Sequence, residues 1–406
     1  MKQAEGSAQG DPGRAGRAEG GEAERAEAER AERPLAIAVL GDANSIHVRR
    51  WVSYFAGHGH KMTLLVPEGV AVEPGYEDGI AIERYAPQAG WRFSQIGLIA
   101  SGLSLRRAVN RIRPDILQVH YLTLNGFRAW MSGFHPRVVT VWGNDVLIDP
   151  RRSARARLLA RLALRSADLV TGGSQHLVKE AVAAGARPER TRYVHLGVDT
   201  DHFRPGDCPP EFRSGLGVPG ARVVLSPRAI APLYRQDVVV EAFARLPAVT
   251  LLVLTLQGAQ KSELAALRAR ADALGVADRI RILPRLAESE LPDLYRLSDV
   301  VVSVPTSDGG PKTVVEALAC GRPVVASDLP PNREWLADLD PGCLVPVGDA
   351  AATAAAIGTV LARSPQQRAE LADRGRAAVL ERADQRLAMA EMEALYRRLA
   401  APPSAR

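Results

Sequence analysis

Residues 300–328 read VVVSVPTSDGGPKTVVEALACGRPVVASD, and they carry the strongest structural signal in the chain. Its β-branched beginning, Val300 to Val304, predicts a buried strand, and Pro323 to Ala326 predicts a second one. Between the two strands, Thr306 to Lys312 has the composition of a turn. A helix from about Thr313 to Cys320 follows this turn and ends at the next glycine. The stretch therefore predicts a strand, a tight loop, a helix and a strand.

The loop in this stretch has the chemistry of an anion-binding site. A Gly-rich loop that leads into a helix directs several backbone N–H groups toward one place, and that place attracts phosphate. Pro311 suits a first helical turn, where its missing N–H costs nothing. Two carboxylates flank the site, because Asp308 opens the loop and Glu316 lies in the helix. The alternative is an ordinary crossover helix whose carboxylates only cap and interact with water.

The spacing Asp308-x7-Glu316, followed by Ala-x-Ala-Cys-Gly-x-Pro-Val-Val-Ala-Ser, resembles the motif of family 4 glycosyltransferases. These are retaining enzymes built from two Rossmann-like domains, an arrangement called the GT-B fold. The resemblance implies that Glu316 holds the ribose hydroxyls of a nucleotide-sugar, while Asp308 and the loop amides hold the sugar and the diphosphate. Relatives usually have Glu followed by Gly-Phe-Gly, so the shorter Asp308 changes the sugar contact. The donor-binding residues expected here are Asp308, Gly309, Gly310, Lys312, Thr313 and Glu316.

Length and composition limit the possible classes. The chain has 406 residues, which predicts two domains, and a hydrophobic fraction of 46%, which is ample for their cores. No stretch approaches the ~20 apolar residues of a membrane span, and the polar N-terminus lacks the apolar region of a signal peptide. Three cysteines without metal-ligand spacing fit a reducing cytosol. The net charge of +6 suits anionic ligands, and few aromatics argue against nucleic acid. We expect a cytoplasmic protein.

The chain divides into four parts. Residues 1–33 are low-complexity Ala, Glu, Arg and Gly, and we expect them to be disordered. Residues 34–203 and 204–384 each alternate strand and helix patterns, which predicts two parallel α/β sheets that face one cleft. The resemblance implies that the first is the acceptor domain and the second the nucleotide-sugar domain, both Rossmann-like as in GT-B. It also implies that the helix within the last part, 385–406, crosses back to the first domain.

The loop after the first predicted strand, GDANS at 41–45, lacks the GxGxxG fingerprint of nicotinamide binding. In the resembling family this loop faces the cleft between the domains and touches the acceptor. The resemblance therefore implies that Asn44, Ser45 and His47 look into the cleft. Helix capping by Asn44 and Ser45 is the alternative.

His120 stands directly after the predicted strand Ile116 to Val119. Doubly wound sheets place their ligand crevice at the carboxyl ends of strands, where a histidine can orient or polarise a substrate. Family 4 enzymes commonly have a histidine in a similar context, so we predict a catalytic role for His120, with a structural histidine as the alternative. Further on, Asp145 either contacts the acceptor or caps the following segment, and Trp142 either stacks on a sugar or fills the core.

The second half carries cations after its first predicted strand, in PRAIAPLYRQD at 227–237. Relatives have an Arg and then a Lys here, and both hold the donor diphosphate. Arg228 matches the Arg, and we expect Arg235 to replace the missing Lys, because arginine suits bidentate phosphate recognition. Two solvated surface arginines are the alternative. Arg285 and Leu286 follow a later strand, at the place where relatives cradle the base.

Residues 151–165 contain six arginines, several leucines and no acidic residue. This pattern fits a cationic amphipathic helix on an anionic membrane, which would place the protein at the inner face of the membrane. We favour the other interpretation, in which the leucines pack on the sheet while the arginines face water.

The resemblance implies a retaining transfer of sugar from a UDP, GDP or ADP type of donor to a glycan, a lipid-linked acceptor or a small molecule. Arg228, Arg235 and the helix N-terminus would stabilise the leaving diphosphate, so we expect neither a metal nor a cofactor, the nucleotide-sugar being a substrate. Two other functions stay open. One is a non-catalytic nucleotide-sugar-binding homologue or partner subunit, and the other is a sugar-nucleotide epimerase of the same architecture.

Overall fold

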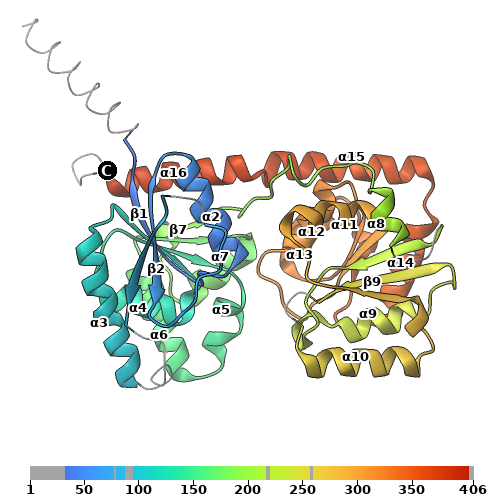
Figure 1. Cartoon of the computed structure of the whole chain (residues 1–406), viewed down its shortest axis with the longest axis horizontal. Helices are drawn as coiled ribbons and strands as arrows, with labels where there is room; N and C mark the ends of the chain where they lie inside the picture. Colours follow the sequence, from blue (N-terminus) through green and yellow to red (C-terminus); the bar gives the residue numbers. More distant parts are fainter. Residues whose placement is uncertain (1–32, 77–78, 87–94, 216–219, 257–258, 402–406) are drawn as a thin grey trace, which may run out of the picture.

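The computed structural model describes residues 33–76, 79–86, 95–215, 220–256 and 259–401, and the predicted tail at 1–33 lies almost wholly outside them. Two parallel sheets, each covered by helices, lie side by side along the long axis of the molecule (Figure 1). This confirms the predicted α/β architecture of two Rossmann-like domains.

The first sheet has the order β3-β2-β1-β4-β5-β6-β7, with all paired strands parallel. Its central strands are almost wholly buried, as expected for a sheet covered on both faces, although they include polar residues such as Gln118 and Thr140. The strands are β1 Ala36–Leu40, β2 Lys61–Pro67, β3 Ala81–Tyr85, β4 Ile116–His120, β5 Arg137–Val141, β6 Leu169–Gly172 and β7 Thr191–Tyr193.

The second sheet has the order β10-β9-β8-β11-β12-β13 and is also parallel. Its strands are β8 Arg222–Ser226, β9 Thr250–Thr255, β10 Ile280–Leu283, β11 Val300–Ser303, β12 Val324–Ser327 and β13 Leu344–Val345. In both sheets the strand order reverses once, between β1 and β4 and between β8 and β11. The loops at these two switch points are where ligands bind in such folds.

The α-helices are α2 Ile46–Gly57, α3 Gln95–Ile112, α4 Phe127–Ser132, α5 Asn144–Leu147, α6 Ala154–Ser166, α7 Gln175–Ala183, α8 Pro210–Ser214, α9 Gln236–Phe243, α10 Lys261–Ala273, α11 Leu291–Leu297, α12 Lys312–Ala319, α13 Pro330–Leu336, α14 Ala350–Ala362, α15 Pro365–Arg382 and α16 Gln385–Ala400. No helix of the described residues has both the length and the apolar character that crossing a bilayer requires.

The stretch 300–328 folds as predicted, into β11, α12 and β12. Every residue of both strands is buried. The helix begins one residue earlier than expected, at Lys312, and Pro311 lies at its N-cap position. Gly321 follows the helix with a φ of 68°, a left-handed conformation that glycine adopts without strain.

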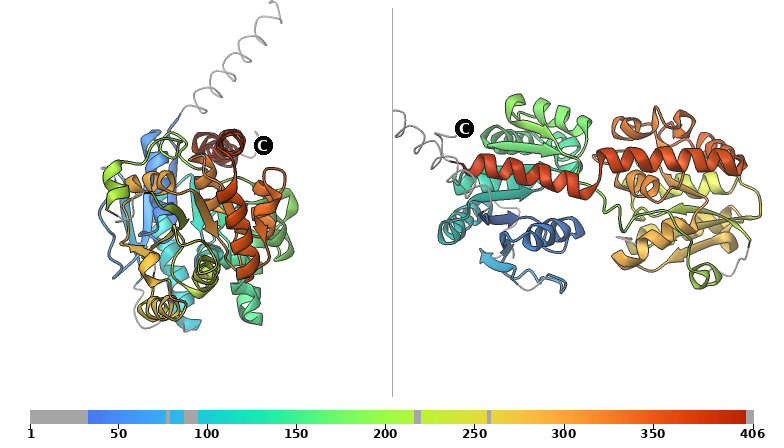
Figure 2. Two further views of the ribbon diagram at one scale, coloured as in Figure 1. Left: turned by 90° about the vertical axis from the view of Figure 1, so that its right-hand side faces the viewer. Right: turned by 90° about the horizontal axis from the view of Figure 1, so that it is seen from above.

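The chain crosses between the domains twice, and the two crossings are hydrogen-bonded to each other. Val198 of the first crossing exchanges backbone hydrogen bonds with Ala383 and Gln385 of the second. Past this point α16 returns to the first domain, as predicted, so that α15 and α16 together run across both domains (Figure 2). Met392 and Tyr396 of α16 are completely buried in the first-domain core, against Trp51.

Candidate functional site

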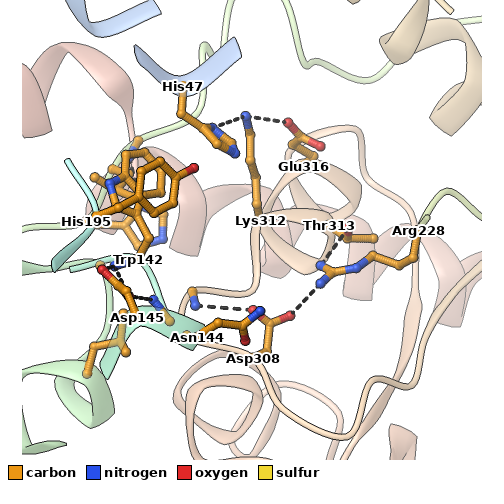
Figure 3. A pocket seen from close by; sticks show the side chains of 18 of the residues that line it. His47, Trp142, Asn144, Asp145, His195, Arg228, Asp308, Lys312, Thr313 and Glu316 are labelled. Carbon is orange, nitrogen blue, oxygen red and sulfur yellow. Dashed lines mark hydrogen bonds and ion pairs between the residues drawn. The ribbon is translucent and has the colours of Figure 1, made fainter. Parts of the chain in front are cut away.

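A cavity of about 500 Å³ lies between the two domains and is lined by residues of both. The loops that build it follow the carboxyl ends of β4, β5, β8 and β11. Of these strands, β8 and β11 lie on the two sides of the second switch point. Figure 3 shows its polar side chains pointing toward one another from the two halves. Its position therefore follows from the order of the strands in the sheets.

The second domain contributes a cation and a carboxylate that face each other beside the N-terminus of α12. One terminal nitrogen of Arg228, Nη2, lies 3.2 Å from Asp308 Oδ2, and the other lies 3.4 Å from Thr313 Oγ1. The guanidinium also lies over the Tyr234 ring, 4.4 Å from its centroid. The backbone N–H of Gly310 donates to Asp308 Oδ1 at 3.3 Å. The loop, the helix start and Arg228 thus converge on one part of the cavity.

Glu316 is buried one turn further along the same helix, and its two oxygens are used differently. Oε2 accepts a hydrogen bond of 2.8 Å from the Tyr295 hydroxyl, whose pKa is held well above its ordinary value by burial and by this carboxylate. Oε1 is 3.6 Å from Lys312 Nζ and 3.8 Å from Arg50 Nη1. Both contacts are ion pairs whose distances exceed that of a hydrogen bond. Oε1 can therefore still accept a hydrogen bond from another group.

Lys312 reaches from α12 toward the first domain. Its Nζ lies 3.4 Å from His47 Nδ1, on α2 (Figure 3). Burial lowers the pKa of Lys312 to about 8, and the neighbouring Arg50 adds to this, while Glu316 opposes it. Burial and the charges of Lys312 and Arg50 hold the pKa of His47 well below its ordinary value. A neutral His47 ring therefore faces the cationic ammonium group of Lys312.

His120 does not reach the cavity, which corrects the prediction of a direct catalytic contact. Its side chain is 0% exposed, and its Nδ1 accepts a hydrogen bond of 3.2 Å from Trp142 Nε1. Burial lowers the pKa of His120 to about 3. Trp142 lines the cavity in front of it, with the rings of His47 and Tyr121 packed nearby. The alternative of a structural histidine describes this geometry.

Two of the predicted acceptor residues, Asn44 and Ser45, do not line the cavity. Asn44 does not line the cavity, because its amide donates to the Ala71 carbonyl and accepts from the Glu73 N–H, which fixes a neighbouring loop. Ser45 is the N-cap residue of α2 but makes no side-chain capping bond, and it does not line the cavity either.

Of the other two predicted acceptor residues, His47 does line the cavity and Asp145 reaches it only in part. The Asp145 carboxylate is buried and accepts hydrogen bonds from the backbone N–H groups of Leu122, Trp142 and Gly143. These contacts organise the start of α5, as the capping alternative describes. Burial raises the pKa of Asp145, and the backbone hydrogen bonds oppose this.

Arg235 also lies away from the cavity. Its backbone is left-handed, with a φ of 49°, and its guanidinium pairs with Asp237 two residues along the chain. Arg285 is exposed, and Leu286 packs against the second-domain core, so neither lines the cavity. Of these three predicted donor arginines, only Arg228 lines the cavity, together with the predicted Lys312.

Three residues that contact the site residues described above were not predicted from the sequence: Arg50, Tyr234 and Tyr295. One signal was available for Arg50, because it lies three residues after His47 on α2 and so shares a face of that helix with it. Tyr295 comes from the neighbouring helix α11, and no local pattern connects it to Glu316.

The domains touch at two glycines beside the cavity. Ser174 Oγ of the first domain donates a hydrogen bond of 2.6 Å to the Gly309 carbonyl. A Cβ on Gly309 would lie 2.4 Å from Gly143 Cα and 2.6 Å from the Trp142 carbonyl oxygen. Because both neighbours are backbone atoms, they cannot move aside as a flexible side chain would. This contact between the domains requires glycine at position 309.

We expect Gly309→Ala to lower kcat/KM about tenfold for the sugar transfer that the sequence resemblance implies, while leaving the melting temperature nearly unchanged. Overpacking costs about 1–3 kcal/mol, and here that cost applies to the contact between the domains rather than to either core. Initial rates and thermal denaturation measure the two quantities. Gly358→Ala is the control, because a Cβ there meets nothing within 4 Å. Equal rates for the wild type and Gly309→Ala would show that the contact is not needed for turnover.

Comparisons with known proteins cover both halves of the chain. The family model described as Glycosyl transferase 4-like matches residues 36–174, and Glycosyl transferases group 1 matches residues 210–378. The chain is 33% identical over 298 residues to a D-inositol 3-phosphate glycosyltransferase of Mycobacterium sp. (strain KMS), covering 72% of this chain and 61% of that protein. It is 36% identical over 262 residues to that of Mycobacterium tuberculosis (strain F11), covering 63% and 48%. The chain thus spans about half to three fifths of the length of these relatives.

Solved structures share the fold along nearly their whole length. Anabaena Alr3699/HepE in complex with UDP and glucose has a TM-score of 0.73 and 22% identity, covering 89% of this chain and 99% of that one. Sucrose-phosphate synthase from Thermosynechococcus elongatus has a TM-score of 0.77 and 20% identity, covering 89% and 98%.

Proposed function

The chain belongs to the family 4 glycosyltransferases with the GT-B fold, and from this premise we propose that it transfers a sugar from a nucleotide-diphosphate donor to an acceptor hydroxyl. One observation carries the proposal. Arg228, Lys312 and the N-terminus of α12 surround the same cavity as the buried carboxylate of Glu316. A nucleotide-sugar requires this combination, since it presents a dianionic linker next to the hydroxyls of a ribose.

Glu316 recognises the ribose in this proposal. The Tyr295 hydroxyl fixes Oε2 and thereby the orientation of the carboxylate, while Oε1 stays available to accept from a ribose hydroxyl. Lys312 and Arg50 lie on the Oε1 side of this carboxylate, within 4 Å of it, and a hydrogen bond to a carboxylate is stronger than one to a neutral acceptor.

The diphosphate binds between Arg228, Lys312 and the backbone N–H groups at the start of α12. Asp308 pairs with Arg228 and accepts hydrogen bonds from the hydroxyls of the transferred sugar. During transfer, the bond from the anomeric carbon to the phosphate oxygen breaks and a bond to the acceptor oxygen forms on the same face. The acceptor proton passes to the departing phosphate oxygen, which gives retention without a protein nucleophile. Cations already in place stabilise the developing negative charge, so we propose a reaction that needs no metal ion.

The donor and the acceptor are assigned by class only. A solved neighbour is in complex with UDP and glucose, which makes UDP-glucose the first donor to test, ahead of GDP- and ADP-sugars. The curated relatives are named for D-inositol 3-phosphate, so this is the first small-molecule acceptor to test. Glycans and lipid-linked sugars are the other two acceptor classes.

A thermal-shift screen of the purified protein against UDP-, GDP- and ADP-sugars, followed by turnover of a radiolabelled donor, tests the proposal. Each kcal/mol of ligand stabilisation raises the melting temperature by roughly 2–4 °C for domains of this size. Transfer gives a product heavier than the acceptor by one sugar residue. An epimerase would instead give a donor of unchanged mass without acceptor, and a binding-only homologue would give a thermal shift and no product. Absence of any shift would contradict nucleotide-sugar binding.

We expect donor affinity to fall about tenfold between pH 7 and pH 9, because Lys312 loses its proton as pH rises through about 8. The same titration has the opposite effect on the stability of the fold. The unfolded lysine, whose pKa is higher, binds more protons in this window, so Lys312 makes the folded state more stable as pH rises. Loss of affinity is therefore separable from unfolding. Titration calorimetry across this range measures it, with Lys312→Met giving a flatter profile and the exposed Lys179→Met following the wild type. A flat wild-type profile would contradict this role.

We also propose that α6 brings the protein to an anionic membrane surface. Its Leu164 is buried against the sheet, as the packed-helix interpretation predicts, but Leu158 is 57% exposed. It lies among four exposed arginines of this helix that have no ion-pair partner in the described part of the chain: Arg155, Arg157, Arg161 and Arg165. Apolar and cationic side chains on one exposed helix suit an anionic lipid surface.

Flotation with anionic liposomes measures this contact. We expect Arg155→Glu combined with Arg157→Glu to abolish flotation, while sugar transfer to a water-soluble acceptor continues at the wild-type rate. Flotation that is unaffected by this charge reversal would count against the membrane contact.

A further inference from the structure

Arg50 crosses from the first domain into the second. It lies on α2, one turn after His47, and its Nε forms an ion pair with Glu288 of the second domain. Its Nη1 lies 3.8 Å from Glu316 Oε1. The side chain is only 17% exposed, and Nη2 is a buried nitrogen without a hydrogen-bond partner. The same residue lines the cavity between the domains.

The charges around Arg50 come from the opposite domain. Both carboxylates that balance it, Glu288 and Glu316, belong to the second domain, and no carboxylate of the described first-domain residues pairs with it. A cation that is mostly buried needs such partners, because a buried charge without a counter-charge carries an uncompensated desolvation penalty. The position of the guanidinium is therefore defined only while the two domains are in contact.

The second observation is that Nη2 of Arg50 is a buried donor without an acceptor. A buried guanidinium N–H without a partner is costly, and native structures seldom leave one unsatisfied. Here the unsatisfied nitrogen belongs to a residue that lines the cavity, next to the carboxylate proposed to hold the ribose. Guanidinium groups match the geometry of phosphate oxygens, and this position lies beside the proposed ribose and diphosphate sites.

We propose that Arg50 is a donor-binding residue supplied by the first domain, and that Nη2 donates to an oxygen of the nucleotide diphosphate. Glu288 is the positioning residue that holds the guanidinium in place through Nε. This inference rests on the proposed function and extends it, because the donor then contacts both domains at once. Donor binding is thereby linked to contact between the domains, which excludes water from the reacting centre.

Titration calorimetry with UDP and with uridine, the nucleotide chosen because of the UDP-bound neighbour, tests the proposal on the full-length protein. We expect Arg50→Met to weaken UDP binding tenfold or more and to leave uridine binding unchanged. Arg50→Lys keeps the charge and restores part of the affinity. Glu288→Gln weakens UDP binding less than Arg50→Met does. In turnover, Arg50→Met raises the KM for the donor and leaves the KM for the acceptor unchanged.

Arg49→Met is the matched control. Arg49 is the neighbouring residue on α2, but it pairs with Glu73 and lies over the Tyr76 ring, within the first domain. We expect wild-type affinity for this variant, and melting temperatures of all variants show that they are folded. Equal UDP affinity of the wild type and Arg50→Met would overturn this inference but not the proposed function. An equal loss of uridine and UDP binding in Arg50→Met would do the same. If the wild type binds no UDP, GDP or ADP, the proposed function is overturned together with the inference.

Discussion

Replacing Glu316 by glutamine is expected to weaken nucleotide-sugar binding about 10- to 100-fold. Hydrogen bonds to charged groups contribute about 1.5–3 kcal/mol, and the amide would keep only one acceptor oxygen for the Tyr295 hydroxyl and the ribose together. With that oxygen on Tyr295, the amide would present N–H donors to hydroxyls that need an acceptor. The substitution also leaves Lys312 and Arg50 without their shared counter-charge. Calorimetric affinity for the donor measures the effect.

The control for this variant is Glu381→Gln, the same chemical change at an exposed position on α15. Its donor affinity should equal that of the wild type. Melting temperatures of both variants are needed, because Glu316 is buried and its replacement alters the second-domain core as well as the ribose site. Unchanged donor affinity in folded Glu316→Gln would remove the ribose assignment, and the rest of the donor site depends on it.

Arg228→Met should lower kcat about 10²- to 10³-fold, the range found when a group that stabilises developing charge is removed. The leaving diphosphate gains negative charge as its bond to the sugar breaks, so the interaction is stronger in the transition state than in the bound donor. We therefore expect a larger effect on kcat than on the donor KM. Initial rates at saturating donor measure it.

A matched control lies on β8, the strand that ends two residues before Arg228. Arg222 is at the other end of β8, where it forms a surface ion pair with Asp299. Arg222→Met should leave kcat unchanged, and Arg228→Lys should recover part of the lost rate. If Arg228→Met raised the donor KM without changing kcat, Arg228 would only bind the ground state, and the proposed charge stabilisation would be wrong.

The part of the site that comes from residues 300–328 was predictable because its signals are local. A β-branched run, a turn-forming loop and a helix stop determine β11, α12 and β12 within 29 consecutive residues. Once these elements are placed, Asp308, Lys312, Thr313 and Glu316 necessarily lie on one loop and one helix face. The parallel order of the strands then brings Arg228 to the same edge of the sheet.

The rest of the site depends on tertiary contacts that no local pattern reports. His120 occupies the expected strand end, but Trp142 from the next strand covers it. Arg235 has the expected spacing, but its left-handed backbone directs it to Asp237. The contacts of Lys312 with His47 and of Arg50 with Glu288 join residues more than 200 positions apart, so they appear only when the domains are assembled.

The burial of Met392 and Tyr396 in the first-domain core has a consequence for biosynthesis. The ribosome makes all seven strands of that domain before the second domain, and it makes α16 after both. Trp51 therefore has no hydrogen-bond partner on Tyr396 until both domains have been translated. The first domain therefore completes its core only after the second domain has been made. A nascent chain released before α16 is synthesised lacks part of that core.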